Sequence, residues 1–427
     1  MNTTSRFFDF ISAAPTSYHA AEKIKSILTE KGFTELSEKD AEAYRDGGAH
    51  FVIRSDSTLI AFKGGRNKES FMISASHSDT PCFKLTSLSE TTSLYSTLAT
   101  ERHGGIIHYS WLDRPLSLAG RICVRDESGI SVRLFDLKRD LLTIPSIAIH
   151  LNQTVNEGYK FNPAKDLQPL FSIGTEKGAL RSLIAQELSV RADDIISSDV
   201  FVYNREQGRT FGYNDELILA PRLDNLASVF TTLEAFLSAP ERDDAVCVLA
   251  VFDNEETGSS TKQGANSTVL CDVLMKIAGS FEKYTAMLTD SFMVSADNAH
   301  AKHPTYPELS NPSASCVLGG GVAVKYNANQ RYATDAVSEA VFSTLAKRAG
   351  AKIQTFASRP DMLCGSTLGS ISTTRVAVCT VDVGLPQLAM HSASESMAKS
   401  DLDDMIKVLT EMYSSRLVRE GSNIVIK

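Results

Sequence analysis

Short apolar runs constrain the fold of this chain more than any other feature of its sequence. They are rich in Val, Ile and Met and lie at residues 71–75, 245–252, 285–288 and 375–383. Runs of this length and composition form strands that are buried on both faces, so helices must cover the sheet on both sides. Helical patterns lie between the runs, including residues 225–239 and 335–348. We therefore predict an α/β fold with a helix-covered mixed sheet.

Residues 90–215 show a different sequence pattern from the rest of the chain. Within them, GRICVRDESGISVRLFDL holds two alternating segments on either side of a Glu127-Ser128-Gly129 turn, which predicts a β-hairpin. A chain of 427 residues also exceeds what one hydrophobic core usually serves. We predict a β-rich domain at residues 90–215, inserted into a catalytic α/β domain that is formed by residues 1–89 and 216–427.

Composition excludes several classes of function. The formal net charge is -8 and no basic stripe is present, which disfavours nucleic-acid binding. No apolar stretch approaches the roughly 18 residues that span a bilayer, and the N-terminus lacks the pattern of a secretory signal. The seven cysteines are scattered, without a CxxC spacing, and most lie inside apolar runs. We expect a soluble cytoplasmic protein that has no membrane partner and no cysteine-based zinc cluster.

Polar clusters stand at or just beyond the ends of the apolar runs. They are His77-Ser78-Asp79, Asp253-Asn254-Glu255-Glu256, Asp290 with Asp297, and His391. In open α/β sheets, ligands bind outside the carboxyl ends of the strands, so these residues can converge there. Asp224, in PRLDNLASVF, is a further candidate at the start of a helical pattern.

Each candidate also has a purely structural interpretation. Asp224 fits the acidic first turn of a helix, His77 fits a buried histidine that is satisfied by Asp79, and the adjacent glutamates fit a solvated turn. Taken together they indicate a metal centre, because two histidines and three carboxylates can complete two zinc sites with one glutamate left over. The spare glutamate is suited to act as a general base. HExxH, GxSxG, GxGxxG and Walker A motifs do not occur.

The polar segments resemble the signatures of the M18 aminopeptidases, the family to which the aspartyl aminopeptidases belong. The matching blocks run in family order and are SASHSDTPCFKL, PRLDNL, DNEETGSSTKQGA, SADNAHAKHP, KYNANQRYA, CGSTLG and LPQLAMHSASESM. TIPSIAIHLN, inside the predicted insertion, also resembles its counterpart. The resemblance implies a binuclear zinc exopeptidase that acts on peptides, with a β-rich domain that supports assembly, commonly as a homo-dodecamer.

The resemblance also implies roles for single residues. His77 and Asp297 would bind one of two zinc ions per subunit, Glu256 and His391 the other, and Asp224 would bridge them. Glu255 would take a proton from the attacking water and return it to the departing amine. Asp79 would orient or polarise the site, and His150, in IAIHLN, would reach the active site of a neighbouring subunit. An ordinary interface histidine is the alternative for His150.

Specificity depends on fewer residues. An acidic N-terminal residue needs a basic partner, for which Lys325 in AVKYNANQRY is the best candidate and Arg331 the second. A solvated loop charge is the alternative for both. The segment 361–370 departs from the proline-containing form that is common in the family, which weakens inference about the pocket wall. Broad or neutral specificity, another amide hydrolase on the same scaffold, and a non-catalytic assembly protein are the competing hypotheses.

Overall fold

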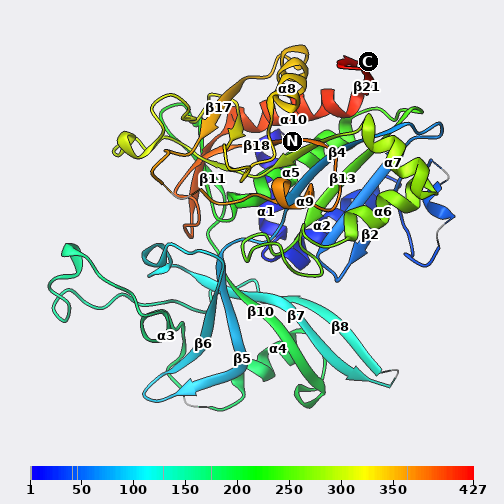
Figure 1. Cartoon of the computed structure of the whole chain (residues 1–427). Helices are drawn as coiled ribbons and strands as arrows, with labels where there is room; N and C mark the ends of the chain where they lie inside the picture. The colour runs from blue at the N-terminus through cyan, green and yellow to red at the C-terminus, as the bar shows by residue number, and fades with distance from the viewer. Residues whose placement is uncertain (1, 41, 46, 128, 175, 363) are drawn as a thin grey trace.

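The largest sheet, called the central sheet below, forms the middle of the upper part of the molecule in Figure 1. The computed structural model describes residues 2–427, except residues 41, 46, 128, 175 and 363. Nine strands of this described part form the sheet in the order β1 (Thr34–Glu35), β2 (His50–Arg54), β3 (Thr58–Gly64), β13 (Ala245–Phe252), β4 (Ser70–His77), β14 (Phe292–Ala296), β18 (Cys379–Gly384), β16 (Val322–Tyr326) and β17 (Ile353–Ala357). Neighbours from β13 to β18 run parallel, whereas β3 runs antiparallel to β2 and β13, and β16 runs antiparallel to β18 but parallel to β17. The sheet is therefore mixed, as predicted.

Helices cover both faces of this sheet. One face packs against α1 (Thr3–Ala13), α2 (Ser17–Glu30), α5 (Leu223–Ser238), α8 (Ala336–Ala349) and α10 (Lys399–Ser414). The other packs against α6 (Val269–Ala278), α7 (Phe281–Thr289) and α9 (Leu368–Ser372). Strand β13 contributes alternate residues to the two cores, and all eight of its residues are buried. This double burial is the physical reason for its continuous apolar run.

Two of the predicted strands differ from the structure. Residues 285–288 lie in α7, and the strand follows at β14. A short apolar run cannot be told from a buried helix by its period alone, and here Tyr284 and Met287, three residues apart, form the buried helical face. Ser280 caps this helix by accepting the Lys283 amide. Within residues 375–383, the strand covers only the last part, from Cys379 onward.

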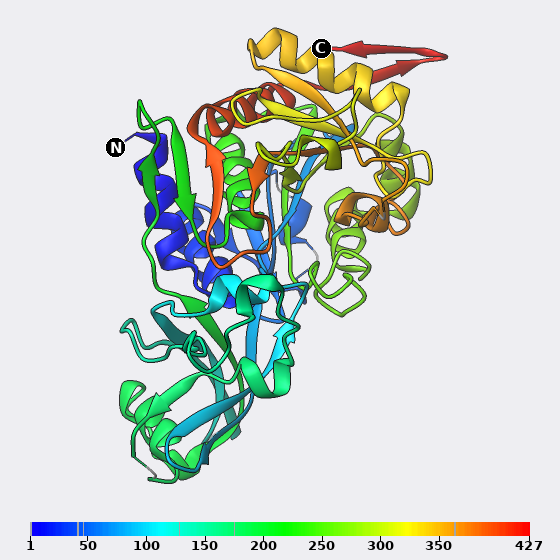
Figure 2. The same cartoon turned by 90° about the vertical axis from the view of Figure 1, so that its left-hand side faces the viewer.

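A second, six-stranded sheet lies apart from the first, below it in Figures 1 and 2. Its order is β8 (Gly129–Asp136), β7 (Leu116–Asp126), β10 (Ile195–Asn204), β5 (Cys82–Thr92), β6 (Ser96–His103) and β9 (Leu170–Ser172). It has its own apolar core, to which α4 (Ala179–Glu187) contributes, and the small helix α3 (Pro163–Asp166) lies in the connection between β8 and β9. Strands β7 and β8 form the predicted antiparallel hairpin, although Ser128 of its turn lies outside the described residues. The division into domains at residues 90 and 215 stays a prediction.

A smaller sheet joins the segments that surround the polar cluster. It has the order β11 (Arg209–Phe211), β12 (Leu217–Ala220), β20 (Glu395–Ala398), β19 (Pro386–Leu388) and β15 (Ala299–His300). The chain ends in the hairpin of β21 (Leu417–Glu420) and β22 (Asn423–Ile426). Among the described residues, no helix combines the length and the apolar character that crossing a membrane requires.

We predict that Tyr413→Phe lowers the free energy of unfolding by about 1–3 kcal/mol, the usual cost of leaving a buried polar group unsatisfied. Tyr413 is fully buried in α10, and its hydroxyl lies 3.0 Å from the Val248 carbonyl oxygen and 2.5 Å from Ser74 Oγ. The helix is thereby tied to β13 and β4. Urea unfolding at matched protein concentration measures the change. Tyr213→Phe is the control, because Tyr213 is 96% exposed; equal stability of the two variants would contradict the prediction.

Candidate metal centre

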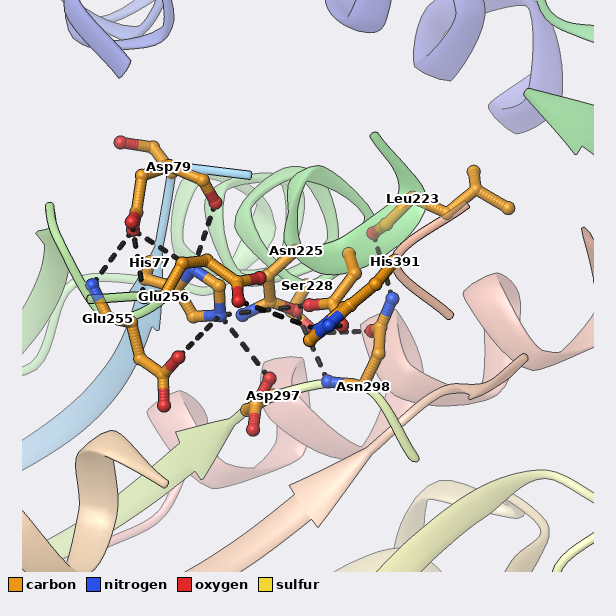
Figure 3. Close-up of polar contacts among 12 residues, drawn as sticks. His77, Asp79, Leu223, Asn225, Ser228, Glu255, Glu256, Asp297, Asn298 and His391 are labelled. Atoms are coloured by element: carbon orange, nitrogen blue, oxygen red, sulfur yellow. Dashed lines mark hydrogen bonds and ion pairs between the residues drawn. The ribbon is translucent and has the colours of Figure 1, made fainter. Parts of the chain in front are cut away.

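Four of the predicted site residues converge at one edge of the central sheet (Figure 3). His77 is the last residue of β4, and Asp297 directly follows β14. Glu255 and Glu256 follow β13. Because β13, β4 and β14 are adjacent and parallel, their carboxyl ends lie together. Two further residues come from segments that adjoin strands of the smaller sheet. Asp224 lies at the start of α5, just after β12, and His391 lies in the loop between β19 and β20.

The two histidines face the same aspartate. His77 Nε2 lies 3.7 Å from Asp224 Oδ1, and His391 Nε2 lies 3.6 Å from Asp224 Oδ2. Each imidazole also has a carboxylate of its own: His77 Nε2 is 3.4 Å from Asp297 Oδ1, and His391 Nε2 is 3.5 Å from Glu256 Oε2. The cluster therefore consists of two donor sets that share the Asp224 carboxylate.

These donor sets fit zinc. Tetrahedral zinc with nitrogen and oxygen ligands at about 2.0–2.2 Å separates its ligand atoms by roughly 3.3–3.6 Å, which is close to the observed spacings. Asp224 Oδ1 is buried and has no hydrogen-bond partner in the described part of the chain. An orphaned carboxylate oxygen is costly unless a cation faces it. One ligand atom each of His77, Asp224 and Glu256 also lie within 4.8 Å of one another, so the two sets adjoin.

The local electrostatics favour positive charge. Burial raises the pKa of Glu255 to about 8, and burial together with Asp224 raises the pKa of Glu256 well above its usual range. Burial opposes ionisation of Asp297 as well, but Lys325 and His77 outweigh it and hold the pKa of Asp297 well below its ordinary value. The cluster thus contains more buried carboxylates than cations to compensate them, which is the electrostatic environment that divalent ions stabilise.

Asp79 positions its neighbours and does not line the cavity beside the cluster. Its Oδ1 accepts the Glu255 main-chain amide at 3.0 Å, and its Oδ2 accepts the Glu256 amide at 3.2 Å. Asp79 Oδ1 also lies 3.3 Å from Nδ1 of His77, which leaves Nε2 of that ring directed at the cluster. His103, at the end of β6, contacts Asp79 Oδ2 through Nε2 at 3.1 Å. A carboxylate behind a histidine fixes the tautomer and orientation of a metal ligand.

Sequence reasoning missed two supporting features. Glu395 is buried, and its carboxylate accepts the main-chain amides of Asp224 and His391. Asn298 is also buried, and it donates to the Leu223 carbonyl and contacts Asn225 and Ser228, so it ties the start of α5 to the end of β14. Neither residue has a distinctive spacing in the sequence; the signal available was only their place inside recognised blocks, in SADNAHAKHP and LPQLAMHSASESM.

Lys325 lies beside the cluster and lines the cavity next to it. It is buried in β16, and its Nζ donates to Asp297 Oδ2 at 3.1 Å. The same ammonium lies 5.5 Å from the centroid of the Tyr332 ring. His300, Phe356 and Thr367 also line the cavity. Of the segment 361–370, residues 365–367 contribute to the wall, and Leu363 lies outside the described residues.

Three other sequence candidates lie elsewhere. Asp290 ends α7 and accepts the Arg419 amide at 2.9 Å, so its assignment to the polar cluster was wrong, for the same reason that the strand at 285–288 was wrong. Arg331 is exposed and does not line the cavity. His150 is exposed in a segment that extends away from the six-stranded sheet before α3 (Figure 1).

Comparison with known proteins gives one consistent family. The family model described as "Aminopeptidase I zinc metalloprotease (M18)" matches residues 10–413. A "Probable M18 family aminopeptidase 2" from Clostridium acetobutylicum is 39% identical over 424 residues, covering 96% of this chain and 98% of the relative. The structure "Cryo-EM structure of the Ape4 and Nbr1 complex" superposes with a TM-score of 0.93 at 32% identity, covering 96% of this chain and 85% of the other. "Structure of S. cerevesiae mApe1 dodecamer" gives a TM-score of 0.84 at 26% identity, covering 96% of both chains.

Proposed function

This chain belongs to the M18 family of zinc aminopeptidases, and we propose that it removes N-terminal residues from peptides with two zinc ions per subunit. The observation that supports the pair of ions is the Asp224 carboxylate, whose two oxygens each face a different imidazole. A carboxylate in this position can bridge two cations. Membership of an aminopeptidase family argues against another amide hydrolase on the same scaffold and against a non-catalytic assembly protein.

The proposed ligands follow the two donor sets. One ion would be held by His77 and Asp297 and the other by Glu256 and His391, with Asp224 shared between them. Zinc in such a site supplies Lewis acidity, which polarises a carbonyl and acidifies water. Lys325 neutralises part of the charge of Asp297, and Asp79 keeps the His77 ring in its orientation.

Glu255 is the proposed general base. Its carboxylate lines the same cavity as the ligands, and its Oε2 is 4.0 Å from His77 Nε2. Because its main-chain amide is held by Asp79, the side chain extends into the cavity from a fixed point. There it can take a proton from water and return it to the departing amine of the first peptide bond.

We predict that the purified protein contains two zinc ions per chain and that the roles separate by mutation. Glu255→Gln should retain both ions and lose about 10²–10⁴-fold in kcat, the usual contribution of a general base. His391→Ala should lose one ion, because it removes one donor set. Elemental analysis together with steady-state kinetics measures both effects. A single ion in the saturated wild type, or equal metal loss in both variants, would contradict the assignment.

An acidic N-terminal residue is the proposed preferred substrate. Lys325 is a buried cation beside the proposed ligands, and it faces the cavity in which the substrate would bind. A buried ammonium favours a carboxylate and disfavours a second cation. Its contact with Asp297 adds a complication, because replacing Lys325 also alters the surroundings of a proposed ligand.

We predict that the wild type prefers N-terminal Asp or Glu over Leu or Lys, and that Lys325→Ala weakens this preference. The decrease in kcat/KM for acidic substrates should correspond to a loss of a few kcal/mol at most in transition-state stabilisation, about the cost of leaving a charged group without its partner. Activity on neutral residues should fall less. Metal content is measured in parallel, with Lys325→Arg as the charge-conserving control. A wild type that favours Leu, or equal losses on both substrate classes with full metal content, would refute the acidic preference.

Assembly as a homo-dodecamer, built partly by residues 90–215, completes the proposal. The segment before α3 exposes apolar side chains that a partner subunit would cover, namely Ile147, Ile149, Leu151 and Tyr159. Exposed apolar surface of this extent is typical of an interface. A solved relative is described as a dodecamer. His150 lies among these residues, and we propose that it reaches the active site of the neighbouring subunit.

We predict a mass of twelve chains by light scattering at micromolar concentration. Leu151→Asp should dissociate the assembly, because the side chain is 83% exposed in the single chain and would be buried at the interface. His150→Ala should keep the assembly and the metal content but lower kcat. Phe281→Ala, at a position that is 62% exposed and lies outside residues 90–215, serves as the control for the mutation of surface residues. A wild-type monomer would refute the assembly.

A further inference from the structure

Glu395 is a buried carboxylate whose position matters to two of the proposed ligands at once. It begins β20 and is 2% exposed. Its Oε2 accepts the Asp224 main-chain amide at 3.0 Å, and its Oε1 accepts the His391 amide at 2.7 Å. Gln387 Nε2 donates to Oε1 at 3.3 Å. The carboxylate therefore spans the gap between the start of α5 and the loop that carries His391.

The backbone of His391 is strained where Glu395 contacts it. His391 has φ +68°, in the left-handed region that a residue with a Cβ adopts at a cost in free energy. Such a conformation persists when the surroundings over-determine it. Asp224 and Asn225 depart from helical φ and ψ values at the start of α5, so the helix alone does not fix the main chain of Asp224. A charge-assisted hydrogen bond to each main-chain amide is a strong restraint of this kind.

The side chains of these two restrained residues must lie at a fixed distance from each other if they are to bind the same metal ion. His391 Nε2 and Asp224 Oδ2 are 3.6 Å apart, a separation that depends on the positions of two segments distant in sequence. Asp79 performs the corresponding task on the other side of the cluster, where it holds the amides of Glu255 and Glu256 and the ring of His77. Asp79 therefore supports one residue of each donor set, His77 and Glu256, whereas Glu395 supports His391 and the shared Asp224.

We propose that Glu395 is a positioning residue that sets the spacing of Asp224 and His391 for the second metal ion. The inference rests on the proposed two-zinc function and deepens it. Glu395 itself does not contact the metal; it acts through the main chain of two ligands. Because an amide side chain offers one acceptor oxygen where the carboxylate offers two, Glu395→Gln would leave one of the two main-chain amides facing an NH₂ group.

Calorimetric titration of zinc into the metal-free full-length protein tests this. Wild type should bind two ions, and Glu395→Gln should bind the ion at His391 about 10–100-fold more weakly, the usual effect of removing a group that orients metal ligands. The ion at His77 and Asp297 should be retained. The visible spectrum of the Co²⁺-loaded protein reports ligand geometry and should change in Glu395→Gln.

Asp401→Asn is the matched control. Asp401 is also a fully buried carboxylate that accepts two main-chain amides, those of Gly319 and Gly321, and it does not line the cavity. Its replacement should lower stability without changing zinc affinity or the Co²⁺ spectrum. Equal loss of zinc affinity in Asp401→Asn would overturn the positioning role, because it would reflect general destabilisation.

The outcomes separate this inference from the function on which it rests. If the wild type binds a single ion, the two-zinc function fails and this inference fails with it. If the wild type binds two ions and Glu395→Gln binds both with unchanged affinity, only the role of Glu395 is overturned. If Glu395→Gln does not fold, Glu395→Asp decides: its carboxylate is one methylene too short to reach both amides, so the second ion should bind about tenfold more weakly, and wild-type affinity would overturn the proposal.

Discussion

The constraint on which the site depends is the burial of the Asp224 carboxylate. Its side chain is 4% exposed, one of its oxygens has no hydrogen-bond partner in the described residues, and two further carboxylates, Glu256 and Asp297, lie close by. Like charges this close cannot all remain ionised without compensation. Asp224 stands at the start of α5, where the helix dipole contributes partial positive charge. That contribution is small beside the charge of a divalent ion, so bound cations would stabilise this edge of the fold far more than the helix does.

The part of the site that was predictable from the sequence is the part that the central sheet determines. His77 ends a strand and Glu256 and Asp297 follow one, and β13, β4 and β14 are parallel neighbours, so these strand ends meet for topological reasons. The apolar runs at β4 and β13 indicated that topology because both strands are buried on two faces. The family resemblance then supplied the separate roles, which geometry alone leaves open.

What the sequence did not reveal depends on contacts between distant main-chain groups. Glu395 accepts hydrogen bonds from main-chain N–H groups. Because every non-proline residue has such a group, no pattern of side chains in the sequence predicts the contact. The same holds for Asp79, whose link to Glu255 and Glu256 is through their main chain. The misplaced strand at 285–288 has another cause: so short a run fits a buried helix face as well as a strand, and burial in α7 decided between them.

The contact between Lys325 and Asp297 bears on how specificity and metal binding are combined. An ammonium carries three donors, and Asp297 Oδ2 takes one of them, which leaves two for a ligand in the cavity. Asp297 in turn directs its other oxygen, Oδ1, at His77. The lysine can therefore serve both partners without competition for the same atom. In the proposed function, a substrate carboxylate would bind to the remaining donors while Asp297 keeps Oδ1 for the metal site.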